Sequence, residues 1–246
     1  MEFGLILDLE TTGINPEQDR IIEIGLIEFI PGDGSLKVLN MYGALEDPGL
    51  PLSEDVKKLT GLDDAMLQGQ RIAWEYVRAL MSRASVIVAH NADFDRGFME
   101  RRPEMAGLTC HWACSMKHID WESKGFRTRA LNYLAADHGF VNPFAHRALF
   151  DCATTLRLID PYFSEMSKRS HLREWRLLAS HAPYEMKDKL RNQRYRWDNV
   201  KRVWYKDILE DTLEVERAFL QNEIYQGRHD THEELELAGR NLQEDM

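Results

Sequence analysis

The chain has 246 residues, of which 43% are apolar, so it can bury a substantial core and is not a disordered chain. Its formal net charge of −10 argues, as a total, against a partner with an anionic surface such as nucleic acid. The charge is uneven, because residues 1–100 hold 8 basic and 18 acidic side chains, residues 101–206 hold 20 and 11, and residues 207–246 hold 3 and 12. The middle section is therefore basic, although the chain as a whole is acidic.

Three cysteines are too few for a disulfide framework in a chain of this length. The first ten residues lack the basic segment of a signal peptide, and no stretch approaches the ~18 apolar residues that span a bilayer. We expect a cytoplasmic protein that does not associate with membranes.

Three apolar runs with short links, over residues 3–9, 21–30 and 35–42, predict an antiparallel meander. The next expected elements are a helix from Ser53, a helix over 73–81, strands over 85–89 and 109–116, and helices over 128–138 and 147–160. Strands that then alternate with helices predict an α/β domain with a mixed sheet over residues 1–165. The polar stretch 164–170 is typical of a linker.

Residues 172–227 predict a small α+β unit of the order βαββα. Its expected elements are a strand over 172–179, a helix over 183–192, a hairpin with strands 195–197 and 202–208, and a helix over 211–227. Residues 228–246 form an acidic tail that we expect to be disordered.

Asp8 and Glu10 end the first apolar run, and on a strand their side chains point to the same face. The adjoining turn, Thr11-Thr12-Gly13, can bring backbone amides close to an anion. A pair of acids at this spacing is common at polar strand ends, so it gains weight only from the other acidic motifs of the chain.

A second acidic group, His90-Asn-Ala-Asp-Phe-Asp95, comes directly after the 85–89 strand, at the end of which α/β folds place their chemistry. The helical pattern separates Asp93 from Asp95 only modestly, and a first-turn acid is often explained by the helix dipole. A third group holds His146 and Asp151, which are about 500° apart on one continuous helix. Both side chains reach one site only if His146 precedes the helix and Asp151 lies in its first turn.

Four carboxylates from three segments would repel one another in a single cleft. Hard divalent cations such as Mg²⁺ or Mn²⁺ relieve this repulsion, and two such ions form a clamp for displacement at phosphorus. A histidine near neutral pKa is a suitable general base for a water nucleophile.

The stretches DLETTG (8–13), HNADFD (90–95) and HRALFD (146–151) resemble the three motifs of the DnaQ-like, DEDDh-type 3′–5′ exonucleases, including exonuclease X and the epsilon proofreading subunit of bacterial DNA polymerase III. The resemblance covers about residues 3–163 and implies an RNase H-like fold, a mixed sheet flanked by helices. It also implies two Mg²⁺ or Mn²⁺ ions and a role for each site residue: metal ligands Asp8, Glu10, Asp95 and Asp151; general base His146; terminal-nucleotide contacts Leu9, Thr11 and Phe94; and, by a looser alignment, Thr60.

The expected activity is release of nucleoside 5′-monophosphates from single-stranded 3′ ends, with DNA favoured. Two alternatives stay open: a 3′ exonuclease of the same fold that acts on RNA, and an accessory proofreading subunit that docks on a polymerase or repair factor. The stretch 191–206 interleaves six basic residues with Tyr195, Trp197, Trp204 and Tyr205. It predicts either a nucleic-acid grip or the aromatic core of the small unit, and the two are about equally favoured.

Cys110, His111, Cys114 and His118 could suggest a zinc site. Their spacing fits no usual zinc motif, and idle thiols are the favoured interpretation.

Overall fold

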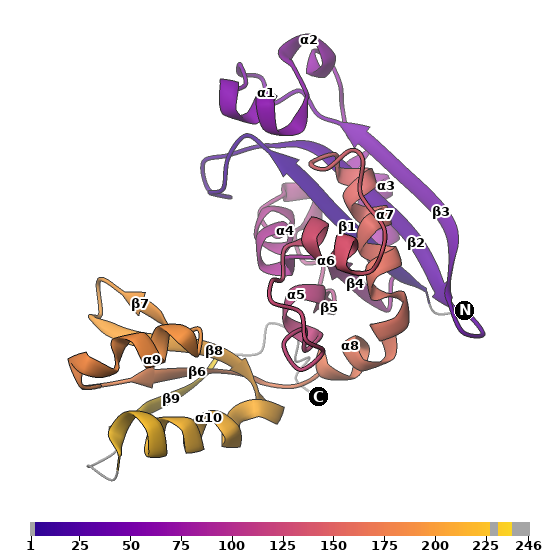
Figure 1. Ribbon diagram of the computed structural model, residues 1–246. Helices are drawn as coiled ribbons and strands as arrows, with labels where there is room; N and C mark the ends of the chain where they lie inside the picture. Colours follow the sequence, from indigo (N-terminus) through magenta and orange to yellow (C-terminus); the bar gives the residue numbers. More distant parts are fainter. Residues whose placement is uncertain (1–2, 227–230, 238–246) are drawn as a thin grey trace. The chain divides into compact units, whose positions relative to one another are not determined.

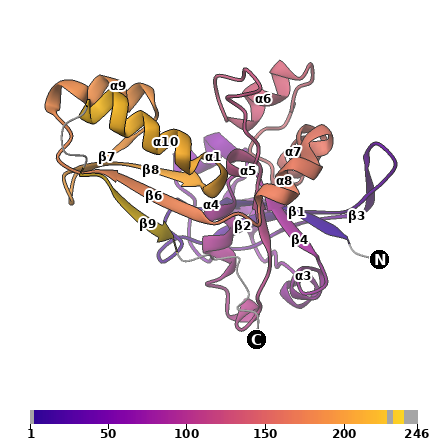
Figure 2. The same cartoon turned by 90° about the horizontal axis from the view of Figure 1, so that it is seen from below.

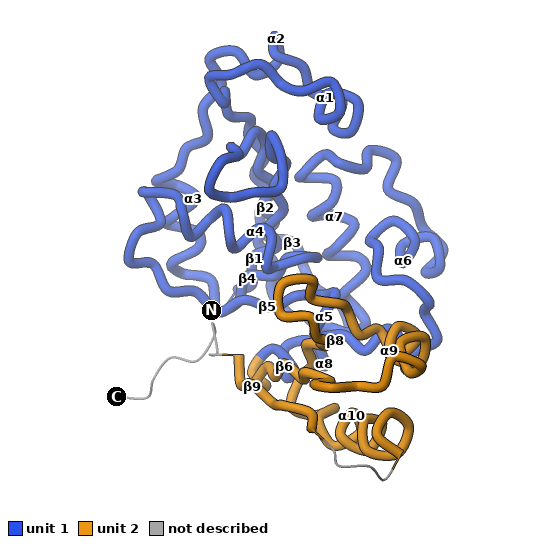
Figure 3. Tube along the Cα trace, turned by 90° about the vertical axis from the view of Figure 1, so that its left-hand side faces the viewer, with its two compact units in different colours: residues 1–170 blue, residues 171–246 orange. Residues whose placement is uncertain are grey.

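The chain forms two compact units, residues 1–170 and 171–246 (Figure 3). The computed structural model describes residues 3–226 and 231–237. Within these residues every helix is too short or too polar to cross a lipid bilayer.

The first unit contains a five-stranded mixed sheet with the strand order β3-β2-β1-β4-β5 (Figure 1). Its strands are β1 (Gly4–Thr11), β2 (Ile21–Pro31), β3 (Leu36–Leu45), β4 (Val86–Ala89) and β5 (Trp112–Cys114). The first three strands pair antiparallel, as the short links predict, whereas β4 is parallel to β1 and β5 is parallel to β4. This is the expected RNase H-like arrangement.

Helices cover both faces of this sheet. They are α1 (Glu54–Thr60), α2 (Asp64–Leu67), α3 (Trp74–Met81), α4 (Ala92–Met99), α5 (Ser115–His118), α6 (Leu131–Asp137), α7 (Ala148–Ile159) and α8 (Phe163–Arg169). Apolar side chains of α3 and α4 pack on one face with Leu5 and Leu7, and those of α6, α7 and α8 pack on the other with Ile6 and Ile27. The alternation of β1 thus decides which of its residues face α7.

The second unit has a four-stranded antiparallel sheet with the order β7-β8-β6-β9. Its elements are β6 (Glu174–Ala179), α9 (Lys187–Asn192), β7 (Arg196–Asp198), β8 (Val203–Leu209), α10 (Leu213–Phe219) with a π-helical extension (Leu220–Tyr225), and β9 (Glu233–Leu237). Both helices lie on one face of the sheet (Figure 2) and share an apolar core with it. The order βαββαβ is the split βαβ arrangement.

Two boundary predictions are wrong. Residues 163–169 form α8 instead of a linker, because Met166 is fully buried against the sheet of the first unit. In the expected tail over 228–246, Glu233–Leu237 form β9, which pairs with β6 through backbone groups that need no apolar composition. Residues 228–230 and 238–246 of that stretch lie outside the described residues.

Candidate metal centre

Strand alternation brings Asp8 and Glu10 to the sheet face that α7 covers, the face to which Ile6 also contributes. Glu10 is paired directly across the β1–β2 ladder with Glu23, and Glu23 is buried. The first motif therefore supplies two carboxylates to one place, and the neighbouring strand adds a third.

The start of α7 brings in the third motif. His146 lies in the loop before the helix, and Asp151 lies in the first turn, the placement that the spacing requires for both to reach one site. The backbone N–H of His146 donates to Asp151 Oδ2 (2.8 Å), and Asn142 Nδ2 donates to Asp151 Oδ1 (2.7 Å). His146 has a φ of 62°, a left-handed conformation that is uncommon for a residue with a side chain and turns the loop back toward the helix.

Glu10, His146 and Asp151 each offer a ligand atom, and these atoms lie within 4.8 Å of one another. Among the residues that the structure describes, this is the one group of three or more acidic, histidine or cysteine side chains with such a spacing. Glu10 and Asp151 are buried, whereas His146 is exposed. A cation held by the two carboxylates would therefore have an imidazole beside it and solvent within reach.

Helix α4 distinguishes the two acids of the second motif. Asp95 is 3% exposed, and its Oδ1 accepts the backbone N–H of Leu9 (3.1 Å), so this carboxylate lies against the strand that holds Asp8 and Glu10. The side chain of Asp93 is 57% exposed and forms an ion pair with Lys117 (2.8 Å). Asp95 thus lies against the strand of Asp8 and Glu10, outside the group of Glu10, His146 and Asp151, and Asp93 belongs to the surface.

Four carboxylates resist ionisation, those of Asp8, Glu10, Asp95 and Asp151. Burial, together with the charges of Asp151, Glu23 and Asp95, raises the pKa of Glu10 to about 8, although the Arg147 guanidinium opposes this shift. Burial raises the pKa of Asp95 to about 8. The pKa of Asp8 is well above its ordinary value because of burial and then the charges of Asp95, Asp151, Glu10 and Glu23. Burial also raises the pKa of Asp151. Such a set is stable in its charged form only with added positive charge.

Glu23 and Arg147 are two residues of the site that sequence reasoning missed. Arg147 donates to both carboxylate oxygens of Glu23 at 3.1–3.2 Å, and the Ala148 N–H donates to Glu23 Oε2 (3.2 Å). The pair ties the start of α7 to β2. A signal was present, because Glu23 is one of two acids, with Glu28, in the mainly apolar run 21–30, but its partner cannot be read from the sequence.

The expected terminal-nucleotide contacts lie in different surroundings. Leu9 and Thr11 are buried on the strand that holds the acids, and Phe94 packs on Phe98 (5.0 Å between ring centroids) immediately before Asp95. Thr60 is buried at the end of α1, where its hydroxyl donates to the Val56 carbonyl (2.9 Å) and accepts the Leu62 N–H (3.1 Å). The Thr60 hydroxyl thus uses its donor within the end of α1 and also accepts a bond there.

The disfavoured zinc site is not formed among the described residues. Cys110, Cys114 and Cys152 are free, and burial raises the pKa of each thiol. His118 Nδ1 instead accepts the backbone N–H of Cys114 (2.9 Å).

Comparison with known proteins identifies the class to which this fold and acidic cluster belong. Residues 5–159 match the model of the RNase T exonuclease family. The chain belongs to this exonuclease family and, with it, to the DnaQ-like superfamily.

Relatives include the PolC-type DNA polymerase III of Caldanaerobacter subterraneus subsp. tengcongensis, 32% identical over 43% of this chain, and that of Pediococcus pentosaceus, 30% identical over 67%. The chain spans 7% and 12% of the length of these polymerases. A solved 3′-exonuclease that recognises the 3′ end of a histone mRNA stem-loop is 17% identical, with a TM-score of 0.52 over 64% of this chain and 79% of that chain. This likeness supports the fold.

Proposed function

We propose that the protein removes nucleotides one at a time from single-stranded 3′ ends, with DNA favoured, and releases nucleoside 5′-monophosphates with the help of two Mg²⁺ or Mn²⁺ ions. The observation that carries the proposal is the grouping of Glu10, His146 and Asp151 within 4.8 Å, with Asp95 bonded to the Leu9 backbone of the same strand and Asp8 on the same strand face as Glu10. Oxygen ligands of this kind suit hard divalent cations. The three free cysteines agree with a reducing, cytoplasmic setting.

In this proposal the four carboxylates hold the ions, which supply positive charge for the attacking and leaving oxygens of the phosphodiester. His146 accepts the proton of the attacking water. Its imidazole suits that task because it is exposed to solvent and lies within 4.8 Å of ligand atoms of Glu10 and Asp151. The backbone bond from His146 to Asp151 keeps the base and this ligand together.

The site is tested with a 5′-labelled oligonucleotide, purified protein and Mg²⁺ or Mn²⁺, with EDTA as the blank. The wild type should give a ladder of shortened products that EDTA abolishes. Asp8→Ala and Asp95→Asn should lose at least about 10²-fold in rate, because each removes a ligand charge. Asp93→Asn is the matched control from the same motif and should keep nearly full activity, since it breaks only a surface ion pair. An unchanged ladder from Asp8→Ala would refute the site.

The role of His146 calls for a second experiment. His146→Ala should lower the rate roughly 10²–10⁴-fold while Mn²⁺ binding, measured by calorimetry, stays close to that of the wild type. A large loss of Mn²⁺ affinity in this variant would instead make His146 a metal ligand and would contradict its role as base.

The preference for DNA rests on the polymerase relatives, whereas the histone mRNA exonuclease favours RNA as the alternative. Digestion of matched DNA and RNA oligomers under one set of conditions decides between them, because the 2′-hydroxyl is the chemical difference. The same relatives favour a polymerase as a partner of this exonuclease.

A further inference from the structure

We propose that the β7–β8 hairpin, residues 194–203, is a second contact for single-stranded nucleic acid, separate from the metal centre. Trp197 would stack on a base, and Lys201 and Arg202 would contact phosphates. The proposal rests on the proposed function in one respect, since it takes the same single-stranded substrate.

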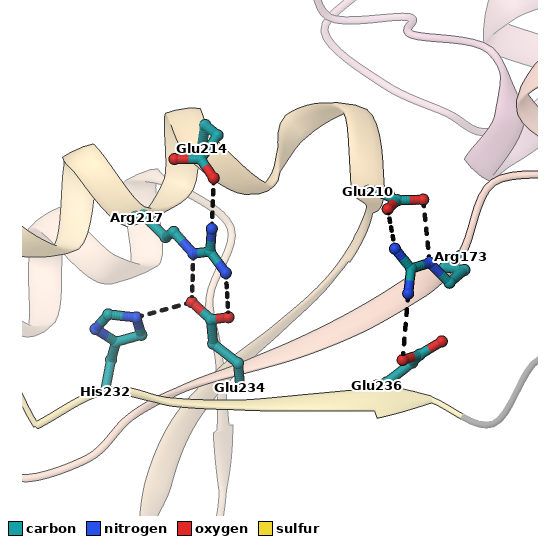
Figure 4. Close-up of polar contacts among 7 residues, drawn as sticks. All are labelled: Arg173, Glu210, Glu214, Arg217, His232, Glu234 and Glu236. Atoms are coloured by element: carbon teal, nitrogen blue, oxygen red, sulfur yellow. Dashed lines mark hydrogen bonds and ion pairs between the residues drawn. The ribbon is translucent and has the colours of Figure 1, made fainter.

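Most cations of the second unit are committed to internal ion pairs. Arg173 bonds Glu210 and Glu236, and Arg217 bonds Glu214 and Glu234 (Figure 4). The other pairs are Arg176–Asp207, Lys189–Glu223, Arg191–Asp188, Arg196–Asp207 and Lys206–Glu216. Within the stretch 191–206 these acids neutralise Arg191, Arg196 and Lys206, so half of its six basic residues stabilise the unit itself.

Lys201 and Arg202 differ from these residues. Both are exposed in the turn between β7 and β8, and neither forms an ion pair within residues 3–226 and 231–237, although the backbone N–H of Lys201 and, to a lesser extent, its nearby charge help to lower the pKa of Asp198. Residues 194–203 contain four basic side chains and one acid, Asp198. Asp198 Oδ1 accepts the backbone N–H groups of Val200 (2.8 Å) and Lys201 (2.9 Å), so this carboxylate folds the turn.

The aromatic residues of this stretch also divide into two groups. Tyr195 and Trp204 pack in the core of the unit, which bears out the core interpretation for these two rings. Tyr205 lies beneath the guanidinium groups of Arg176 and Arg196. Trp197 is on the edge strand, opposite Trp204 in the β7–β8 register, and is 44% exposed. It contacts Trp204 edge to face, with 5.5 Å between ring centroids, which fixes its indole without burying it.

A fixed, exposed indole on the same hairpin as two exposed cations that form no ion pair among the described residues matches a ligand with flat apolar faces and a negative backbone. Single-stranded nucleic acid has both features, and stacking on an aromatic side chain needs no particular base. An acidic protein segment would satisfy the cations but would not use the indole. The exposed Trp197 indole, held by its contact with Trp204, therefore favours nucleic acid over an acidic protein segment.

The test is fluorescence anisotropy with the full-length protein, a labelled single-stranded oligonucleotide and EDTA, which prevents cleavage. Trp197→Ala should weaken binding roughly tenfold. The double variant Lys201→Glu/Arg202→Glu should weaken it at least about tenfold and should reduce the slope of log affinity against log salt by about 1.4, which corresponds to two phosphate contacts. The control Lys189→Glu/Arg191→Glu makes the same charge change in α9 and should have much less effect.

Three results would overturn the proposal: unchanged binding by the Lys201/Arg202 variant, an equal loss in the α9 control, or displacement of the oligonucleotide by polyglutamate as effectively as by unlabelled oligonucleotide. The last result would show an acid-binding surface instead. Thermal melting of each variant distinguishes lost binding from lost folding. A wild type that binds but does not digest oligonucleotides with Mg²⁺ would refute the proposed function and leave this binding result intact.

Discussion

Glu23 has two roles at the metal centre. It is a buried acid beside Glu10 that adds to the repulsion within the cluster, and it also holds Arg147 and the first N–H of α7. Arg147 in turn places a positive charge that lowers the pKa of Glu10. One ion pair therefore positions the helix that carries Asp151 and tempers the negative field of the cluster.

Glu23→Gln tests this positioning role. We expect a roughly tenfold lower kcat, because the start of α7 loses a charged anchor and the reacting groups are displaced slightly. KM should change much less, since Glu23 is not among the proposed substrate contacts. Glu28→Gln, on the same strand, is the control and should be close to the wild type, because Glu28 accepts a bond from Asn40 and lies 4.0 Å from the exposed Arg83. Equal effects on kcat in both variants would contradict the role.

At the scale of elements, the site depends on how closely α7 approaches β2. Gly25 allows this approach, because a Cβ atom at this position would lie 2.5 Å from the Ala148 carbonyl carbon and 2.6 Å from Leu149 N. Gly43, its neighbour in the β2–β3 register, faces only the Leu149 side chain, and a Cβ there would lie 3.3 Å from Leu149 Cδ2. A side chain can give way more easily than helix backbone can.

Gly25→Ala should therefore push the N-terminus of α7 away from the sheet. We expect a loss of about 1–3 kcal/mol in the free energy of unfolding and a fall in activity of at least about tenfold, because Asp151 and His146 move with the helix. Gly43→Ala should change either quantity little. Urea unfolding and oligonucleotide digestion measure both effects, and similar results for the two alanine variants would refute this account of helix placement.

The strands that carry the first acidic motif are predictable from local sequence. Nearly continuous apolar runs identify β1 and β2, and the alternation of side chains along β1 places Asp8 and Glu10 on one face. Long-range partners cannot be read from local sequence. Glu23 and Arg147 are 124 residues apart, and Asp95 accepts a hydrogen bond from the backbone of Leu9, which is 86 residues away. Strand β9 was missed because three of its five residues are acids, which leaves no apolar run of the kind that indicates the other strands.

At the scale of the whole molecule, charge links stability to pH and metal. Glu10 and Asp95 have folded pKa values of about 8, above their ordinary values. Groups of this kind favour the folded state at pH values below their ordinary pKa, and that contribution is lost as pH rises through the folded value. His90 and His118, with pKa values lowered to about 4 and about 3 by burial, are neutral above pH 6.5 in the folded state. The carboxylates therefore dominate the pH dependence expected above that point.

The metal-free protein should accordingly melt at lower temperature as pH rises from 6.5 to 8.5, by on the order of several degrees. Added Mg²⁺ binds the folded, deprotonated cluster, so it should raise Tm more at pH 8.5 than at pH 6.5, relative to NaCl of equal ionic strength. Glu10→Gln removes one of the ionising groups, and this variant should show both a flatter pH dependence and a smaller gain from Mg²⁺. Scanning calorimetry across the pH range measures all three quantities. A gain from Mg²⁺ that is equal at both pH values would mean that the cluster is already ionised at pH 6.5, and would contradict the raised pKa values.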